Sequence, residues 1–77
     1  MKDKRLTALG QRIRTLRQSK GLSQEEFAAS AGLDRAYYGG IERGERNVAA
    51  LNLIKISQAL ELEVGDLFPS HSTLKRL

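Results

Sequence analysis

The chain has 77 residues, of which 40% are hydrophobic and 29% charged, a mixture typical of one soluble globular domain with a small core. It has no cysteine, one histidine, a net charge of +4 and no apolar run near the roughly 20 residues that cross a bilayer. These features exclude disulfides, a histidine-based metal cluster and a membrane span. We therefore expect a soluble, cytoplasmic protein that is not an enzyme and binds no cofactor.

The first predicted helix covers residues 4–20 and ends at Gly21, in the position of a left-handed C-cap. Its apolar stripe is formed by residues at spacings of three and four, namely Leu6, Leu9, Ile13 and Leu16. Arg17 follows at the edge of this stripe. Because burying an unpaired charge is costly, Arg17 should have a partner elsewhere in the chain.

Two short helices joined by a glycine-containing turn are predicted next. The sequence SQEE at 23–26 is a capping box, with Ser at the N-cap and Glu at N3, and it begins a helix over residues 24–30. Asp34 is a good N-cap for a further helix over residues 35–43. The connection at 31–34 is a tight turn, so the pair is a predicted helix-turn-helix.

Two more helices complete the predicted domain, which spans residues 1–68. A fourth helix over residues 50–60 is apolar on more than one side, and a fifth over residues 64–68 is stopped by a proline. The tail, residues 69–77, is polar and basic, and we expect it to be partly disordered. No strand pattern is present, so the fold class is all-α, a compact five-helix domain.

Positive charge is concentrated near the start of the chain. Residues 1–20 contain seven basic residues and one acidic residue, whereas residues 48–68 contain one basic and three acidic residues. This asymmetry suits a polyanionic partner, nucleic acid before membrane. A solvated helix face would give the same pattern, so charge alone leaves both interpretations open.

Three segments of the sequence resemble the Cro/CI or XRE-type helix-turn-helix regulators: GLSQEEFA (21–28), AGLDRAYYGGIERGERN (31–47) and LIKISQALEL (53–62). The resemblance covers about residues 5–68 and implies a lambda-repressor-like DNA-binding fold. Within this superfamily, the chain length and the IERGERN segment are most similar to the small controller proteins of bacterial restriction–modification systems. Phage and plasmid repressors share much of the same pattern.

The resemblance implies a transcriptional regulator, bacterial or phage in origin, that binds a pseudo-palindromic operator in double-stranded DNA as a homodimer. A controller would regulate its own gene and a neighbouring endonuclease gene. Because the chain is short, we expect no domain that binds a small-molecule effector. Two alternatives stay open: a phage- or plasmid-type repressor, and an antitoxin or adaptor that uses this fold on a protein partner.

A recognition helix presents its first residues to the major groove, where each base pair offers a distinct pattern of donors and acceptors. The predicted base-contacting residues are Arg35, Ala36, Tyr37, Gly39 and Gly40. Arg35 is the best candidate, because a guanidinium can bind guanine O6 and N7 together. The adjacent glycines Gly39 and Gly40 indicate close approach to DNA or tight packing against the preceding helix, and both interpretations stay open.

Residues on either side of the turn and after the recognition helix are predicted to contact the DNA backbone. This set comprises Ser23, Gln24, Asp34, Arg43, Arg46 and Asn47. Gln24 lies in the first turn of its helix, where free N–H groups and the helix dipole favour a phosphate. Asp34 fits the role of N-cap better than that of a base contact. A solvated surface charge is the alternative for each arginine.

The remaining predictions concern stability and assembly. The resemblance implies a salt bridge between Glu42 and Arg17, which agrees with the position of Arg17 beside the apolar stripe. No second carboxylate, metal ligand or nucleophile accompanies Glu42, so we assign it no catalytic role. Tyr38 is expected in the core with its hydroxyl at the rim. The predicted dimer interface consists of Leu51, Ile54, Val64 and Phe68, for which core packing is the alternative.

Overall fold

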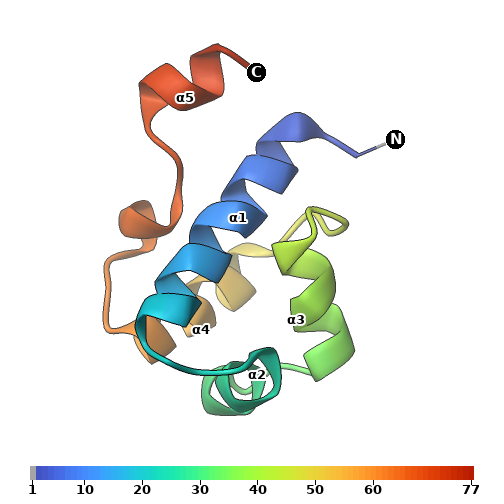
Figure 1. The fold of residues 1–77 in the computed structure, drawn as a ribbon, viewed down its shortest axis with the longest axis vertical. Coiled ribbons are helices and arrows are strands. Elements are labelled where there is room, and N and C mark those ends of the chain that lie inside the picture. Colours follow the sequence, from blue (N-terminus) through green and yellow to red (C-terminus); the bar gives the residue numbers. More distant parts are fainter. Residues whose placement is uncertain (1) are drawn as a thin grey trace.

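The computed structural model describes residues 2–77, and all the regular structure in this range is helical (Figure 1). The elements are α1 (Lys4–Ser19), α2 (Gln24–Ala31), α3 (Arg35–Glu42), α4 (Ala50–Leu60), the 3-10 helix η1 (Val64–Leu67) and α5 (His71–Lys75). The predicted all-α class is confirmed, and each of the five predicted helices ends within one residue of its expected bounds. No helix in residues 2–77 has the length and apolar character needed to cross a bilayer.

Caps fix the start of α2 and both ends of the turn between α2 and α3. The Ser23 Oγ accepts from the backbone N–H of Glu26 at 3.1 Å, and the Glu26 carboxylate accepts from the N–H of Ser23 at 2.9 Å. Gly32 ends α2 in the left-handed conformation, with φ of 72°. Asp34 then caps α3 by accepting from the N–H of Tyr37 at 3.0 Å. Each such cap contributes about 0.5–2 kcal/mol, so the turn is closely defined.

A single core holds the helices together. In Figure 1, α1 runs through the middle of the molecule, with α3 to one side and α4 behind it. The side chains of the core are Leu9, Ile13, Phe27, Ala28, Ala31, Tyr38, Ile41, Ile56, Leu60 and Leu67. Every element from α1 to η1 contributes at least one of them. The core therefore fixes the orientation of α3 relative to the other helices.

Gly10 permits a close approach of α1 to the end of α3. A Cβ at Gly10 would clash with the backbone oxygen of Ile41 and lie 2.6 Å from that of Glu42. The two helices therefore touch backbone to backbone at this point. This contact was not predicted from the sequence, because a glycine within a helical pattern does not show what lies opposite it.

Residues 70–77 differ from the sequence-based expectation of a partly disordered tail. Here the structure contains the short helix α5, and the Ser70 Oγ caps it by accepting from the N–H of Thr73 at 3.1 Å. Figure 1 shows α5 on the side of α1 away from α3. A helix of five residues spans too few turns to produce a recognisable apolar period. The helix therefore had no signal in the sequence beyond its serine cap.

Candidate nucleic-acid interface

The first turn of α3 presents side chains to solvent. Arg35 and Ala36 are exposed, and Tyr37 is half-buried. Asp34, which precedes them, has its carboxylate bonded to the helix backbone and therefore serves as the N-cap. The two outermost candidates for base contact, Arg35 and Ala36, thus project from the start of a short, capped helix.

Tyr37 is held from two sides. Its Oη accepts a hydrogen bond from the Nδ2 of Asn52, in the first turn of α4, at 2.9 Å. The guanidinium carbon of Arg46 lies 5.7 Å from the centre of the Tyr37 ring, within the range of a cation–π contact. Tyr37 therefore connects α3 both to α4 and to the segment that follows α3. The sequence analysis missed Asn52, because one polar residue in an apolar helix gives no sign of its partner.

Gly39 and Gly40 lie beneath arginine side chains. A Cβ at Gly39 would lie 3.0 Å from the Nη1 of Arg43, and a Cβ at Gly40 would lie 3.2 Å from the Cγ of Arg46. Both glycines are buried as a result. They make room for Arg43 and Arg46 to fold back along α3. A Cβ at Gly39 would also lie 3.3 Å from the Oε1 of Gln24, so tight packing against α2, one of the two interpretations that the sequence left open, is present at Gly39.

The loop after α3 carries several charges close together. The Nε of Arg43 lies 3.1 Å from the Oε1 of Glu45, and the Nζ of Lys2 lies 3.9 Å from its Oε2. These pairs are exposed, so each contributes at most about 1 kcal/mol to stability. Asn47 is also exposed, as is Ser23 at the start of α2. Their side chains are accessible to a nucleic-acid backbone.

Gln24 has an internal partner rather than a free side chain. Its Nε2 donates to the Oε1 of Glu42 at 2.9 Å, and the residue is half-buried. Its Oε1 lies close to Gly39 on α3. Gln24 therefore ties the first turn of α2 to α3, a contact that the sequence analysis did not anticipate.

Arg17 and Glu42 form a buried ion pair. The Nε of Arg17 lies 2.7 Å from the Oε2 of Glu42, and its Nη2 lies 3.0 Å from the Oε1. The Arg17 side chain is 9% exposed and that of Glu42 only 1%. Arg17 also donates from Nη1 to the backbone oxygen of Leu22 at 2.7 Å. This two-pronged geometry is the strong form of such a pair, and it joins α1, α3 and the α1–α2 connection.

Opposing effects set the pKa of Glu42. Burial alone would raise this pKa, but the hydrogen bonds from Arg17 and from the other donors around the carboxylate outweigh burial and lower it. The pKa of Arg17 is raised, chiefly by its hydrogen bonds to Glu42. Both groups are therefore charged at neutral pH, and each satisfies the other.

Tyr38 lies in the core as expected, but its hydroxyl is not where the sequence analysis placed it. The prediction that its hydroxyl would lie at the rim was wrong, because the whole residue is buried and its ring lies 5.1 Å from that of Phe27, centre to centre. Within residues 2–77 the hydroxyl has no hydrogen-bond partner. Burial raises the pKa of Tyr38, and the negative charge of Glu42 acts in the same direction. The side chain is a neutral part of the core.

Three of the four predicted interface residues are exposed apolar side chains. Leu51 is 62% exposed, Ile54 41% and Phe68 40%, whereas Val64 is half-buried. Packing in the core of one chain therefore does not account for Leu51, Ile54 or Phe68. We call these three residues, two on α4 and one directly after η1, the α4 apolar face.

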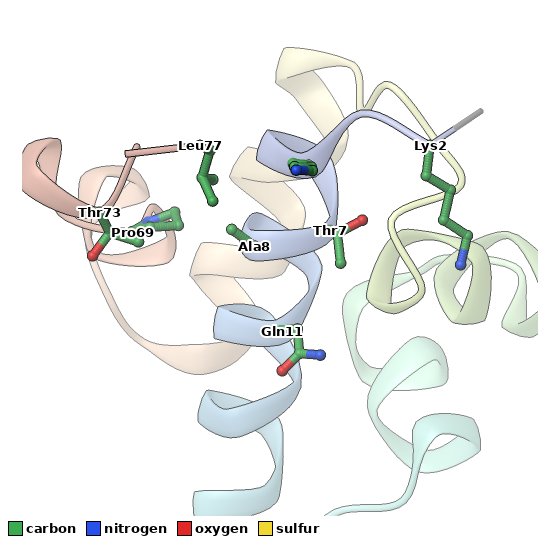
Figure 2. A pocket seen from close by; sticks show the side chains of 8 residues that line it. Lys2, Thr7, Ala8, Gln11, Pro69, Thr73 and Leu77 are labelled. Carbon is green, nitrogen blue, oxygen red and sulfur yellow. The ribbon is translucent and has the colours of Figure 1, made fainter. Parts of the chain in front are cut away.

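A hollow of about 540 Å³ lies between the first half of α1 and the C-terminal segment (Figure 2). The lining residues are Lys2, Lys4, Thr7, Ala8, Gln11, Pro69, Thr73 and Leu77, and Figure 2 shows Ala8 on the side of α1 toward Leu77 and Pro69. The hollow is open, and its lining includes no acidic side chain and no histidine. Elsewhere in residues 2–77, no group of three or more acidic or histidine side chains is placed to hold a metal ion.

Comparison with known proteins identifies the class to which this arrangement belongs. The helix-turn-helix family profile matches residues 13–67. The control protein C.MunI of a Mycoplasma species is 50% identical over 60 residues, which cover 77% of this chain and 81% of that protein. The crystal structure of the restriction–modification controller protein C.AhdI from Aeromonas hydrophila aligns with a TM-score of 0.80 and 54% identity, over 82% of this chain and 96% of that chain.

A DNA-bound structure is also similar. SinR, described as the master regulator for biofilm formation and solved in complex with DNA, aligns with a TM-score of 0.74 and 38% identity, over 77% of this chain and 95% of that chain. The fold and the capped turn between α2 and α3 thus define a helix-turn-helix DNA-binding regulator of transcription. This chain belongs to the helix-turn-helix family of the XRE type, and restriction–modification controller proteins are among its similar relatives.

Proposed function

We propose that the chain is a restriction–modification controller that binds a pseudo-palindromic operator in double-stranded DNA as a homodimer. The observation that carries the proposal is the exposed first turn of α3, where Arg35 and Ala36 project from a helix fixed by its cap and by the buried pair beneath it. The similarity to C.AhdI and C.MunI favours a controller over a phage or plasmid repressor.

The base contacts come from the start of α3. Arg35 would bind guanine O6 and N7, a contact that discriminates by about 1–3 kcal/mol. Ala36 would contact a thymine methyl group, and Tyr37 a further base. Gly39 and Gly40 would contribute by allowing Arg43 and Arg46 to fold back along α3.

The phosphate contacts flank these residues. Ser23 and Gln24, at the start of α2, would approach a phosphate through the Ser23 hydroxyl hydrogen, the second Nε2 hydrogen of Gln24 and the free N–H groups of the first turn. Asp34 is placed to contribute only through the backbone of its turn, because its carboxylate caps α3. Arg43, Arg46 and Asn47 would contact the neighbouring backbone.

Dimerisation follows from the small size of one recognition helix, which contacts few base pairs. A two-fold dimer places two such helices about 34 Å apart, one turn of DNA, and so doubles the contacted sequence. The α4 apolar face, together with Val64, is our candidate interface, because three of these side chains are exposed in the single chain. Residues 1–68 would then serve both DNA binding and dimerisation.

Regulation would depend on protein concentration and operator occupancy in the bacterial cytoplasm. A controller of this kind regulates its own gene and a neighbouring endonuclease gene. The expected partners are therefore the operator DNA and a second copy of the chain.

The test is selection of bound duplexes from a random DNA pool, at low and at physiological salt. We expect an enriched inverted repeat whose half-sites lie about one turn apart. Binding that disappears with salt and enriches no sequence would reflect attraction to the phosphate backbone alone. That result would reject the proposal and favour an antitoxin or adaptor that uses this fold on a protein partner.

Replacing Arg35 tests the assignment of the base contact. Arg35→Ala should weaken binding to the selected operator by about 2–6 kcal/mol, because the dimer loses one such contact in each half-site, and should relax the preference at one position of each half-site. The matched control is Arg14→Ala, an exposed arginine of α1, which should leave the selected sequence unchanged and alter affinity equally for all duplexes. An unchanged motif for Arg35→Ala would reject this role for Arg35.

A further inference from the structure

Asn52 connects α4 to α3. It is the third residue of α4, half-buried, and its Nδ2 donates to the Oη of Tyr37 at 2.9 Å. Leu51, the preceding residue, points out to solvent with 62% of its surface exposed. The first turn of α4 thus presents an apolar side chain outward and an amide toward α3.

The direction of this hydrogen bond determines what Tyr37 can offer to a ligand. A tyrosine hydroxyl has one hydrogen to donate and two lone pairs that accept. Because Asn52 donates, it occupies a lone pair and leaves the hydroxyl hydrogen of Tyr37 available. The cation of Arg46 over the ring makes the surroundings positive, which favours an acceptor and disfavours a second donor.

We propose that Asn52 is a positioning residue that makes Tyr37 a hydrogen-bond donor toward one base of the operator, a role that rests on the proposed function. In the major groove, guanine O6 and thymine O4 are acceptors, whereas adenine N6 and cytosine N4, at the corresponding places, are donors. Tyr37 therefore selects guanine over adenine, or thymine over cytosine, at the position that it contacts. Asn52 itself does not touch the DNA.

The decisive variant is Asn52→Asp, which reverses the hydrogen bond. An ionised carboxylate only accepts, so it takes the hydrogen of Tyr37 and leaves the tyrosine oxygen with lone pairs for the DNA. An acidic residue in the first turn of a helix is favourable to the helix dipole, so α4 should remain folded. Circular dichroism and thermal unfolding verify the fold, and Tyr37→Phe, which lacks the hydroxyl, is the matched control.

The measurement is the dissociation constant for the selected operator and for duplexes in which one base pair of each half-site is exchanged by a transition. For the wild type, one position should prefer guanine or thymine by about ten- to a hundredfold, as expected for one hydrogen bond in each of the two half-sites. Tyr37→Phe should remove that preference, and Asn52→Asp should reverse it to adenine or cytosine. The preference at the position contacted by Arg35 should be unchanged in both variants.

Each result has a distinct meaning. If the wild type enriches no sequence at all, the proposed function fails, and the role of Asn52 fails with it. If the wild type has a motif but Asn52→Asp lowers affinity equally for every duplex, Tyr37 contacts a phosphate or nothing, and only the role of Asn52 is rejected. An Asn52→Asp variant that keeps the wild-type preference at every position also rejects it.

Discussion

The α2–α3 region and the α4–η1 region of this domain differ in how their surfaces are prepared for a partner. In the first region, Gln24 and Glu42 join the two helices and Arg17 anchors them to α1. The polar side chains there are held by specific hydrogen bonds, so the exposed residues project from helices of fixed orientation. A surface of this kind suits a ligand that is recognised through directed hydrogen bonds.

The α4–η1 region has the opposite character. Its exposed residues include Leu51, Ile54 and Phe68, and the N-cap residue of α4, Ala49, makes no side-chain cap. A surface of exposed apolar side chains gains stability from almost any complementary apolar surface, because the hydrophobic effect is not directional. The first region therefore holds polar side chains in fixed positions, as the proposed base recognition requires. The second region exposes apolar side chains that a partner could bury, as the proposed dimerisation requires.

The largest expected effect comes from breaking the polar framework of the first region. Glu42→Leu should lower the free energy of unfolding by about 3–5 kcal/mol, because it leaves the guanidinium of Arg17 buried without its partner. The double variant Arg17→Met with Glu42→Leu should recover most of this loss, since it removes both charges. Urea unfolding of both single variants and the double variant measures the coupling. Losses that simply add would show that the pair is not coupled.

Sequence patterns predicted the helix caps better than the contacts between helices, for a physical reason. Capping at Ser23 and Asp34 depends on residues three apart in the chain, so the pattern that signals it is local. Gly10 contacts two residues of α3 that lie 31 and 32 positions later in the chain. The hydrogen bond from Asn52 to Tyr37 joins residues 15 positions apart. Such contacts depend on helix packing, which the helical period of one segment does not specify.

Arg17 and Tyr38 show the same limit on prediction from opposite sides. Arg17 stood beside an apolar stripe, so its need for a partner could be deduced, and the family resemblance supplied Glu42. Tyr38 gave no such signal, because an aromatic ring with a hydroxyl suits both a core and its rim. Only the packing of its ring on Phe27 decides that it is fully buried.

A smaller effect is expected from making the α4 apolar face polar. Leu51→Asn should raise the dimer dissociation constant about a hundredfold, because each copy in a two-fold interface loses the burial of the 62% of Leu51 that is exposed in the single chain, at about 1–2 kcal/mol apiece. The matched control is Leu77→Asn, an exposed leucine that lines the hollow beside α1 (Figure 2). Sedimentation equilibrium measures both. Equal effects of the two substitutions would exclude the α4 apolar face as the interface.

The close approach of α1 to α3 gives a prediction of similar or smaller size. Gly10→Ala should destabilise the fold by about 1–3 kcal/mol, because the added methyl group meets backbone oxygens that cannot turn aside. Gly65→Ala is the control, since a Cβ there would have no atom within 4 Å. Chemical unfolding should separate the two variants clearly. A Gly10→Ala protein as stable as the wild type would mean that the helices can move apart without loss.

The smallest expected effect is the dependence of stability on acid. The pKa of Glu42 is lowered in the folded protein, so its contribution is complete above its ordinary value of 4.5 and is lost as the pH falls through the lowered value. Because burial offsets part of the effect of Arg17, the contribution is smaller than the loss caused by removing Glu42.

The pKa values of Asp3 and Glu26 are also lowered, but both carboxylates are retained in the double variant Arg17→Met with Glu42→Leu. The difference in unfolding free energy between the wild type and that variant therefore reports the titration of Glu42 alone. Below about pH 4.5 the wild type should lose more stability than the variant. Parallel losses in the two proteins would show that the buried pair does not sense acid, and that the stability of the first region depends on its packing rather than on its charges.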